Sequence, residues 1–92
     1  MHVYVNKNDI LRGVKRDGNK CPIALAVKRM SPKHSIFVAW NVVRMFHPIE
    51  KAERIAIIPL TVRRWMRRFD IMKKKNIEPI QFRLNFQKWD RE

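Results

Sequence analysis

Residues 59–75 read P-L-T-V-R-R-W-M-R-R-F-D-I-M-K-K-K and predict an amphipathic helix. Thr61 suits the N-cap, because its hydroxyl can accept a hydrogen bond from a free N–H of the first turn, and Pro59 keeps the preceding chain extended. Successive helical residues turn by about 100°, which confines the apolar side chains to one arc. These are Val62, Trp65, Met66 and Phe69. We therefore expect this face to be buried.

The opposite arc of the same predicted helix is basic. Its arginines are Arg63, Arg64, Arg67 and Arg68, and the lysines Lys73, Lys74 and Lys75 follow directly. A guanidinium group grips phosphate in bidentate fashion, whereas lysine would serve solubility equally well. A solvated surface is the alternative interpretation of such a run. We favour binding of an anionic partner, whose identity the charge does not give.

Length and composition indicate a single folded domain. The chain has 92 residues, 46% of them apolar, which is ample for one core. Its formal charge is +13, from 21 Lys and Arg against 8 Asp and Glu. Self-repulsion of this size weakens a small fold, and an anionic partner relieves it. Nucleic acid, nucleotides and acidic protein surfaces are the partners expected first.

The compartment is expected to be the cytoplasm. The single cysteine, Cys21, cannot form an internal disulfide framework and indicates a reducing environment. No basic region followed by an apolar run opens the chain, and no apolar stretch approaches the roughly 18 residues that span a bilayer. The basic helix leaves a membrane surface conceivable, but the core needs its aromatic residues, so membrane binding is disfavoured.

The other segments predict the order strand, helix, strand, strand, helix, strand. Expected are strands at 2–5, 54–58 and 80–86, one long strand at 35–46 bulged near Asn41, a brief helical turn at 9–12, a helix at 21–30, and an exposed tail at 87–92. Asn6 or Asn8 would cap the helical turn, and Gly13 would end it in the left-handed conformation. We expect one α+β domain, residues 1–92, in two layers: an antiparallel or mixed sheet with both main helices on one face.

The helix at 21–30 follows a basic loop. Pro22 suits the first helical position, and the predicted buried stripe is Ile23, Ala26, Val27 and Met30. The loop holds Lys15, Arg16 and Lys20 around a turn at Asp17-Gly18. These cations and the free N–H groups of the helix predict an anion site.

Cys21 stands where a helix N-terminus and nearby cations lower a thiol pKa, so it is a candidate nucleophile. The favoured interpretation is nevertheless a small, partly buried residue that starts the helix and packs. A thiol enzyme also needs a base, and His2, His34 and His47 are scattered. Neither metal-ligand spacing nor a phosphate-binding Gly-rich loop is present. We expect no enzyme, no cofactor and no metal. Trp40 and Trp89 are candidates for base stacking, whereas Trp65 belongs to the buried stripe.

Several short motifs are shared with a known group of proteins. They are C-P-I-A-L-A at 21–26, Gly13, Pro59-Leu60, Phe69-Asp70, and Pro79 with Phe82. In these the chain resembles small uncharacterised proteins of phage and mobile-element genomes, which have a Cys-Pro-x-Ala-x-Ala helix and a Phe-Asp … Pro-x-x-Phe carboxy-terminal half. The resemblance carries no activity. It implies a phage-type origin, hence the host cytoplasm, and a role against host machinery or defence. The basic run is heavier than that group's pattern requires.

The expected function is therefore binding without catalysis. A phage-type protein of this charge could antagonise host defence by sequestering a nucleotide signal or by blocking a nucleic-acid-handling complex. The alternatives are a general DNA- or RNA-binding protein and an interaction module for an acidic host protein. A nucleotide pocket would need the basic loop to converge with the basic helix or a second subunit, while duplex binding needs an open stripe. A homodimer is permitted but not required.

Overall fold

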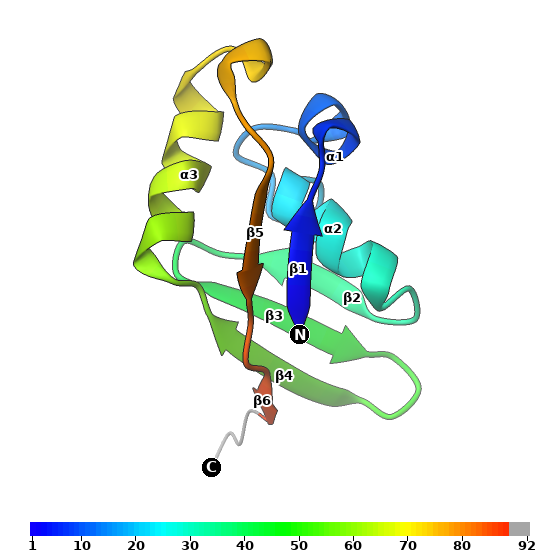
Figure 1. Cartoon of the computed structure of the whole chain (residues 1–92). Helices are drawn as coiled ribbons and strands as arrows, with labels where there is room; N and C mark the ends of the chain where they lie inside the picture. The colour runs from blue at the N-terminus through cyan, green and yellow to red at the C-terminus, as the bar shows by residue number, and fades with distance from the viewer. Residues whose placement is uncertain (89–92) are drawn as a thin grey trace.

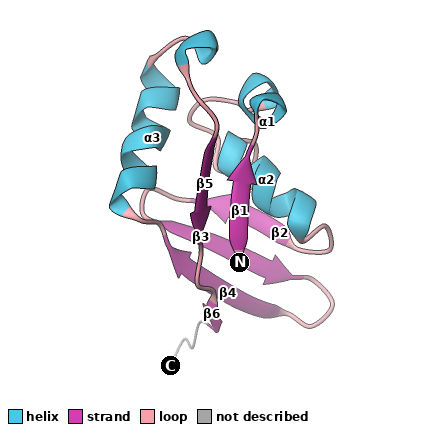
Figure 2. Ribbon diagram, viewed as in Figure 1, coloured by secondary structure: helices cyan, strands magenta, loops and turns pink. Residues whose placement is uncertain are grey.

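The computed structural model describes residues 1–88 (Figure 1). The elements are β1 (His2–Val5), α1 (Lys7–Arg12), α2 (Pro22–Met30), β2 (Ser35–Val38), β3 (Val42–His47), β4 (Ala52–Ile57), α3 (Leu60–Ile71), a 3-10 turn η1 (Lys74–Asn76), β5 (Ile80–Arg83) and β6 (Gln87–Lys88). The expected α+β class is confirmed. The prediction of a single sheet is wrong, since the strands form two antiparallel sheets, β1-β5 and β2-β3-β4-β6 (Figure 2).

The two sheets are joined by helix α2. In Figure 1, α2 and α3 lie above β2, β3 and β4, and the β1-β5 pair runs across the direction of these strands. Helix α2 contacts both β1 and β2. Its Ala24 and Ala26 are fully buried, and such small side chains let a helix approach a sheet closely. The predicted buried stripe holds for Ile23 and Val27, but Met30 at the end of the helix is exposed.

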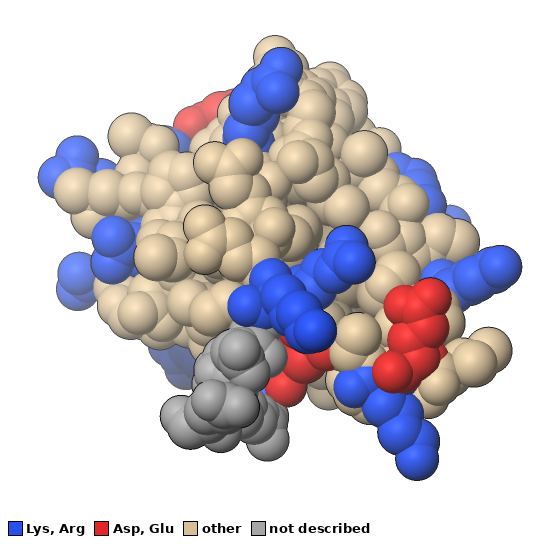
Figure 3. All heavy atoms as spheres, turned by 90° about the horizontal axis from the view of Figure 1, so that it is seen from below, with Lys and Arg blue, Asp and Glu red and all other residues tan. Residues whose placement is uncertain are grey.

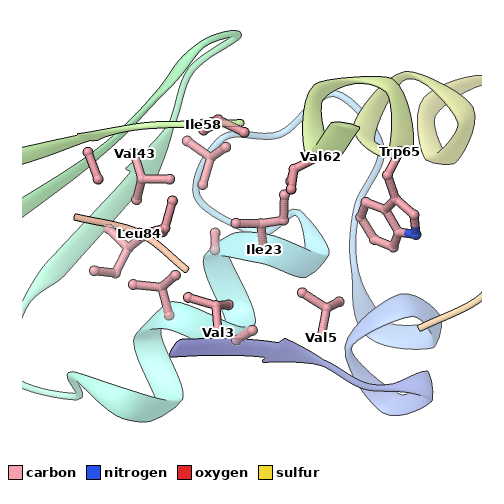
Figure 4. Packing of buried hydrophobic residues seen from close by; sticks show 14 of the residues in the cluster. Val3, Val5, Ile23, Val43, Ile58, Val62, Trp65 and Leu84 are labelled. Atoms are coloured by element: carbon pink, nitrogen blue, oxygen red, sulfur yellow. The ribbon is translucent and has the colours of Figure 1, made fainter. Parts of the chain in front are cut away.

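The core lies between the four-stranded sheet, both long helices and β1. Figure 4 shows Val43, Ile23, Val62 and Val3 pointing toward one another from four different elements. The register puts Val43 opposite Val38 on one side and Ala56 on the other, so one face of the sheet is continuous and apolar. A large apolar side chain buried in this way stabilises the fold by about 1.5–3 kcal/mol.

Helix α3 is amphipathic as predicted. Val62, Trp65 and Phe69 are buried, and the two rings stack with centroids 6.0 Å apart. Trp65 Nε1 donates a hydrogen bond to the Glu78 carbonyl at 2.8 Å, which satisfies its polar group within the core. Thr61 is not the N-cap. The helix begins at Leu60, because the Pro59 carbonyl already accepts hydrogen bonds from Val62 and Arg63.

The predicted long strand at 35–46 is two strands. The chain turns at residues 39–41, where the Ala39 N–H donates to the Val42 carbonyl at 2.8 Å, and β2 and β3 form a hairpin. The loss of alternation near Asn41 marks a reversal of the chain and not a bulge. Trp40 stands in this turn and is 60% exposed. The predicted pairing with the next strand is confirmed, since β4 lies antiparallel to β3.

The amino-terminal helical turn is held by polar contacts. Asn6 caps α1 in a reciprocal capping box with Asp9, as one of the two expected asparagines. Asp9 is buried and pairs with Arg29 at 2.6 Å. Gly13 does not adopt the left-handed conformation, because its φ is −62°. It is needed for space: an added Cβ would lie 2.6 Å from Pro22 Cγ.

The carboxy-terminal strand alternates as predicted. Phe82 and Leu84 are less exposed than Gln81 and Arg83, although β5 ends at Arg83. Gln87 and Lys88 are exposed as expected of the tail, but they are not a free end, because they form β6 and pair with β4. Residues 89–92, and with them the stacking candidate Trp89, lie outside the described residues.

Candidate nucleic-acid interface

The exposed arc of α3 carries three of the four predicted arginines. Arg64, Arg67 and Arg68 are exposed, together with the apolar Leu60 and Ile71. Arg68 pairs with Glu78 at 2.7 Å, but both side chains are solvated, so the pair contributes little to stability. The pKa of Glu78 is lowered by its own backbone N–H and by Arg68. This arc therefore offers positive charge to a partner.

Arg63 is not on that arc. It is half-buried, and its Nε is enclosed without a hydrogen-bond partner among residues 1–88. It precedes Met66 by three residues and Asp70 by seven, a spacing that puts all three on one half-buried side of the helix. The sequence pattern placed Arg63 correctly outside the apolar stripe, but it could not show that a second surface reaches this side.

Two of the lysines predicted to bind an anion, Lys74 and Lys15, instead donate hydrogen bonds to backbone carbonyls of the fold. Lys74 Nζ donates to the carbonyls of Leu11 and Gly13 at 2.9 and 2.7 Å, and so satisfies carbonyls at the end of α1. Lys15 Nζ donates to the Met72 carbonyl at the end of α3 at 2.5 Å. Lys73, Lys75 and Lys20 are exposed.

The basic loop and the basic helix converge. Besides the Lys15 contact, the Arg16 N–H donates to Asp70 Oδ1 at 3.2 Å. Arg16 has a φ of 60°, a left-handed conformation that costs a non-glycine residue about 1 kcal/mol. Local strain of this kind is held by surrounding contacts and concentrates at functional sites. The loop and the helix thus meet at this point, through the Arg16 backbone and the Lys15 amine.

An aromatic pocket of about 300 Å³ lies at this junction. It is formed by the loop at 16–18, the start of α2, the β2–β3 turn and the half-buried side of α3. The apolar side chains of its walls include Phe37, Trp40, Trp65, Met66 and Phe69, and its charged residues are Arg16, Asp17 and Asp70. Sequence reasoning missed this pocket because four distant segments build it. The one feature of the sequence that pointed to this pocket was Trp40, which stands where the alternation of the predicted strand is lost.

Gly18 lets the loop reach the edge of β2. Its carbonyl accepts a hydrogen bond from the Val38 N–H at 2.8 Å. A Cβ on Gly18 would lie 2.7 Å from the Val38 carbonyl oxygen and 2.8 Å from Phe37 Cε2. The turn predicted at Asp17-Gly18 is present, since Asp17 accepts from the backbone of Asn19 and Lys20. This turn forms one wall of the aromatic pocket.

Cys21 lines the same pocket, and the pKa of its thiol is not lowered there. Burial raises the pKa of the thiol, and this outweighs the lowering by the N–H groups of Ala24 and Ile23 at the start of α2. Asp70 and Asp17 raise the pKa further. The raised pKa gives no support to Cys21 as a nucleophile and agrees with the favoured interpretation, a small residue that starts the helix and packs.

Other chemistry receives little support from the described chain. His34 and His47 meet edge to face with ring centroids 4.9 Å apart, next to Glu50 and Arg54. Within residues 1–88, no cluster of three or more His, Cys, Asp or Glu side chains could hold a metal ion. None of the helices formed by these residues is long and apolar enough to cross a membrane.

Positive charge is not confined to α3. Figure 3 views the molecule from below, and many Lys and Arg side chains but few Asp and Glu are visible on that side. No protein-family model, curated protein or solved structure matches this chain. The resemblance to small phage proteins stays a prediction.

Proposed function

We propose that this protein binds nucleic acid without catalysing a reaction on it, through the exposed arc of α3. The observation that supports this most directly is the exposure of Arg64, Arg67 and Arg68 on one helix face, where among residues 1–88 a single carboxylate, that of Glu78, forms an ion pair, with Arg68. Exposed Lys73 and Lys75 extend the positive surface beyond the helix. Phosphate groups are the natural partners of such a surface.

The number of proposed phosphate contacts predicts the salt dependence of binding. The five exposed cations of this surface would neutralise about five phosphates, which corresponds to a slope of about −4 to −5 in log K against log salt. Since the arginines occupy about one helical turn, the contact is short and supplies little sequence information. A role against host defence stays a prediction from the resemblance.

The test is a salt titration of binding to labelled DNA. We expect Arg64→Gln combined with Arg67→Gln to weaken binding and to make the slope shallower by about 2. The matched control is Lys33→Gln with Arg54→Gln, which removes the same charge from exposed positions outside α3. An equal loss in both variants would contradict an α3 interface.

A second arm addresses the chemistry of the anion. Polyglutamate carries carboxylates where DNA carries phosphates, so a phosphate-directed arginine surface should prefer DNA at equal charge concentration. Equal binding of both polymers would point to an acidic protein surface as the partner. Binding of neither polymer would rule out the α3 interface.

A further inference from the structure

We propose that the aromatic pocket receives one unpaired nucleobase of the bound strand, with cytosine preferred over thymine or uracil. This deepens the proposed function and rests on it. The consequence is a preference for single-stranded over double-stranded nucleic acid, because a base inside a duplex cannot enter a pocket without leaving its stack.

The size and lining of the pocket fit one heteroaromatic ring. Its volume of about 300 Å³ is at the lower end of ligand pockets, which suits a small ring system better than a large ligand. Trp40 is 60% exposed and Phe37 is 45% exposed, so two large aromatic faces remain in contact with solvent. Stacking of a base on such faces is the usual way in which proteins hold single strands.

The polar groups of the pocket favour a base whose edge carries a hydrogen-bond donor. Within residues 1–88, the hydrogen bonds of Asp17 and Asp70 use Oδ1 of each carboxylate, which leaves Oδ2 to accept a further bond. Carboxylates accept from the exocyclic amino group of cytosine. Thymine and uracil lack that amino group and present a carbonyl oxygen instead, which a carboxylate repels.

The carboxylates of Asp17 and Asp70 also keep the phosphate of the inserted nucleotide out of the pocket. Two of them against one arginine, Arg16, make the pocket itself unsuitable for a phosphate group. The phosphate of the inserted nucleotide must therefore remain outside. Arg63 and Arg67 lie three residues before the pocket residues Met66 and Asp70, and hence one turn away on the same side of α3. The pocket thus adjoins the proposed phosphate-binding surface.

The test compares oligo(dC), oligo(dT) and a duplex of the same length. We expect oligo(dC) to bind most tightly. Trp40→Leu should weaken oligo(dC) binding about tenfold and leave duplex binding unchanged. Phe46→Leu is the matched control, because Phe46 is another exposed aromatic residue, 39% accessible, outside the pocket. Asp70→Asn keeps an oxygen for the Arg16 N–H and should reduce the preference for oligo(dC) over oligo(dT).

The single cysteine gives an independent measurement on the unmodified protein. Since Cys21 lines the pocket, oligo(dC) should slow its alkylation at mildly alkaline pH more than oligo(dT) does. Salt-dependent binding with no effect of Trp40→Leu and no protection of Cys21 would overturn the base pocket and leave the α3 interface intact. If the unmodified protein bound neither the oligonucleotides nor the duplex, both the base pocket and the α3 interface would be overturned.

Discussion

Gly18 is a residue whose lack of a side chain lets the loop at 16–18 lie against β2. Because a Cβ there would meet the Val38 carbonyl oxygen at 2.7 Å, Gly18→Ala must push the loop away from β2. We expect a loss of about 1–3 kcal/mol in the free energy of unfolding, as for other overpacked sites, together with weaker binding of oligo(dC). Denaturant unfolding measures the first effect. Asn19→Ala, at an exposed neighbour, should stay within about 0.5 kcal/mol of the parent protein.

His34 makes the fold sensitive to mild acid. Burial lowers its pKa, and His47, Arg54 and Lys28 add to this while Glu50 opposes it. The folded protein therefore binds a proton less readily than the unfolded chain, whose histidine has a pKa of about 6.5. Stability should fall as the pH drops below that value and level off below the folded-state pKa. Thermal unfolding between neutral and mildly acidic pH measures this fall, which should be smaller in His34→Gln. An unchanged fall in that variant would assign it to other groups.

At the scale of elements, the lysines after α3 divide into one that is bonded within the fold and others that are exposed and proposed to bind. Lys74 donates to two carbonyls at the end of α1, whereas Lys75 is exposed. We expect Lys74→Gln to destabilise the fold by about 1–2 kcal/mol, since hydrogen bonds to a charged group are lost, and to speed amide exchange in α1. At physiological salt, where repulsion among cations is screened, Lys75→Gln should change stability by less than about 0.5 kcal/mol and should weaken nucleic-acid binding. The reverse pattern would show that the two roles are wrongly assigned.

The same elements show what the sequence could and could not reveal. The buried face of α3 was predictable, because the spacing of Val62, Trp65 and Phe69 is a local consequence of helical geometry. The β2–β3 hairpin was not, since its turn at 39–41 has neither Gly nor Pro to mark it. The β1–β5 pairing and the aromatic pocket join residues far apart along the chain, and no local pattern records such contacts.

For the whole molecule, the net charge of +13 couples stability and binding in opposite directions. Only three ion pairs, Arg29–Asp9, Arg44–Glu53 and Arg68–Glu78, form within residues 1–88, so most of the repulsion among cations is unrelieved. Salt screens this repulsion, with a Debye length that falls from about 30 Å at 0.01 M to about 8 Å at 0.15 M. The free protein should therefore unfold at a higher temperature as salt is added, while its affinity for DNA falls.

The matching measurement is a thermal unfolding series in sodium chloride, with and without oligo(dC). Bound oligonucleotide supplies the negative charge that salt otherwise provides, and it also stabilises the folded state by mass action. The gain in unfolding temperature caused by the oligonucleotide should thus be largest at low salt and should vanish at high salt, where binding is lost. Arg64→Gln with Arg67→Gln should raise the low-salt stability of the free protein and reduce that gain. If the variant were less stable than the parent at low salt, these arginines would be supporting the fold and not a binding surface.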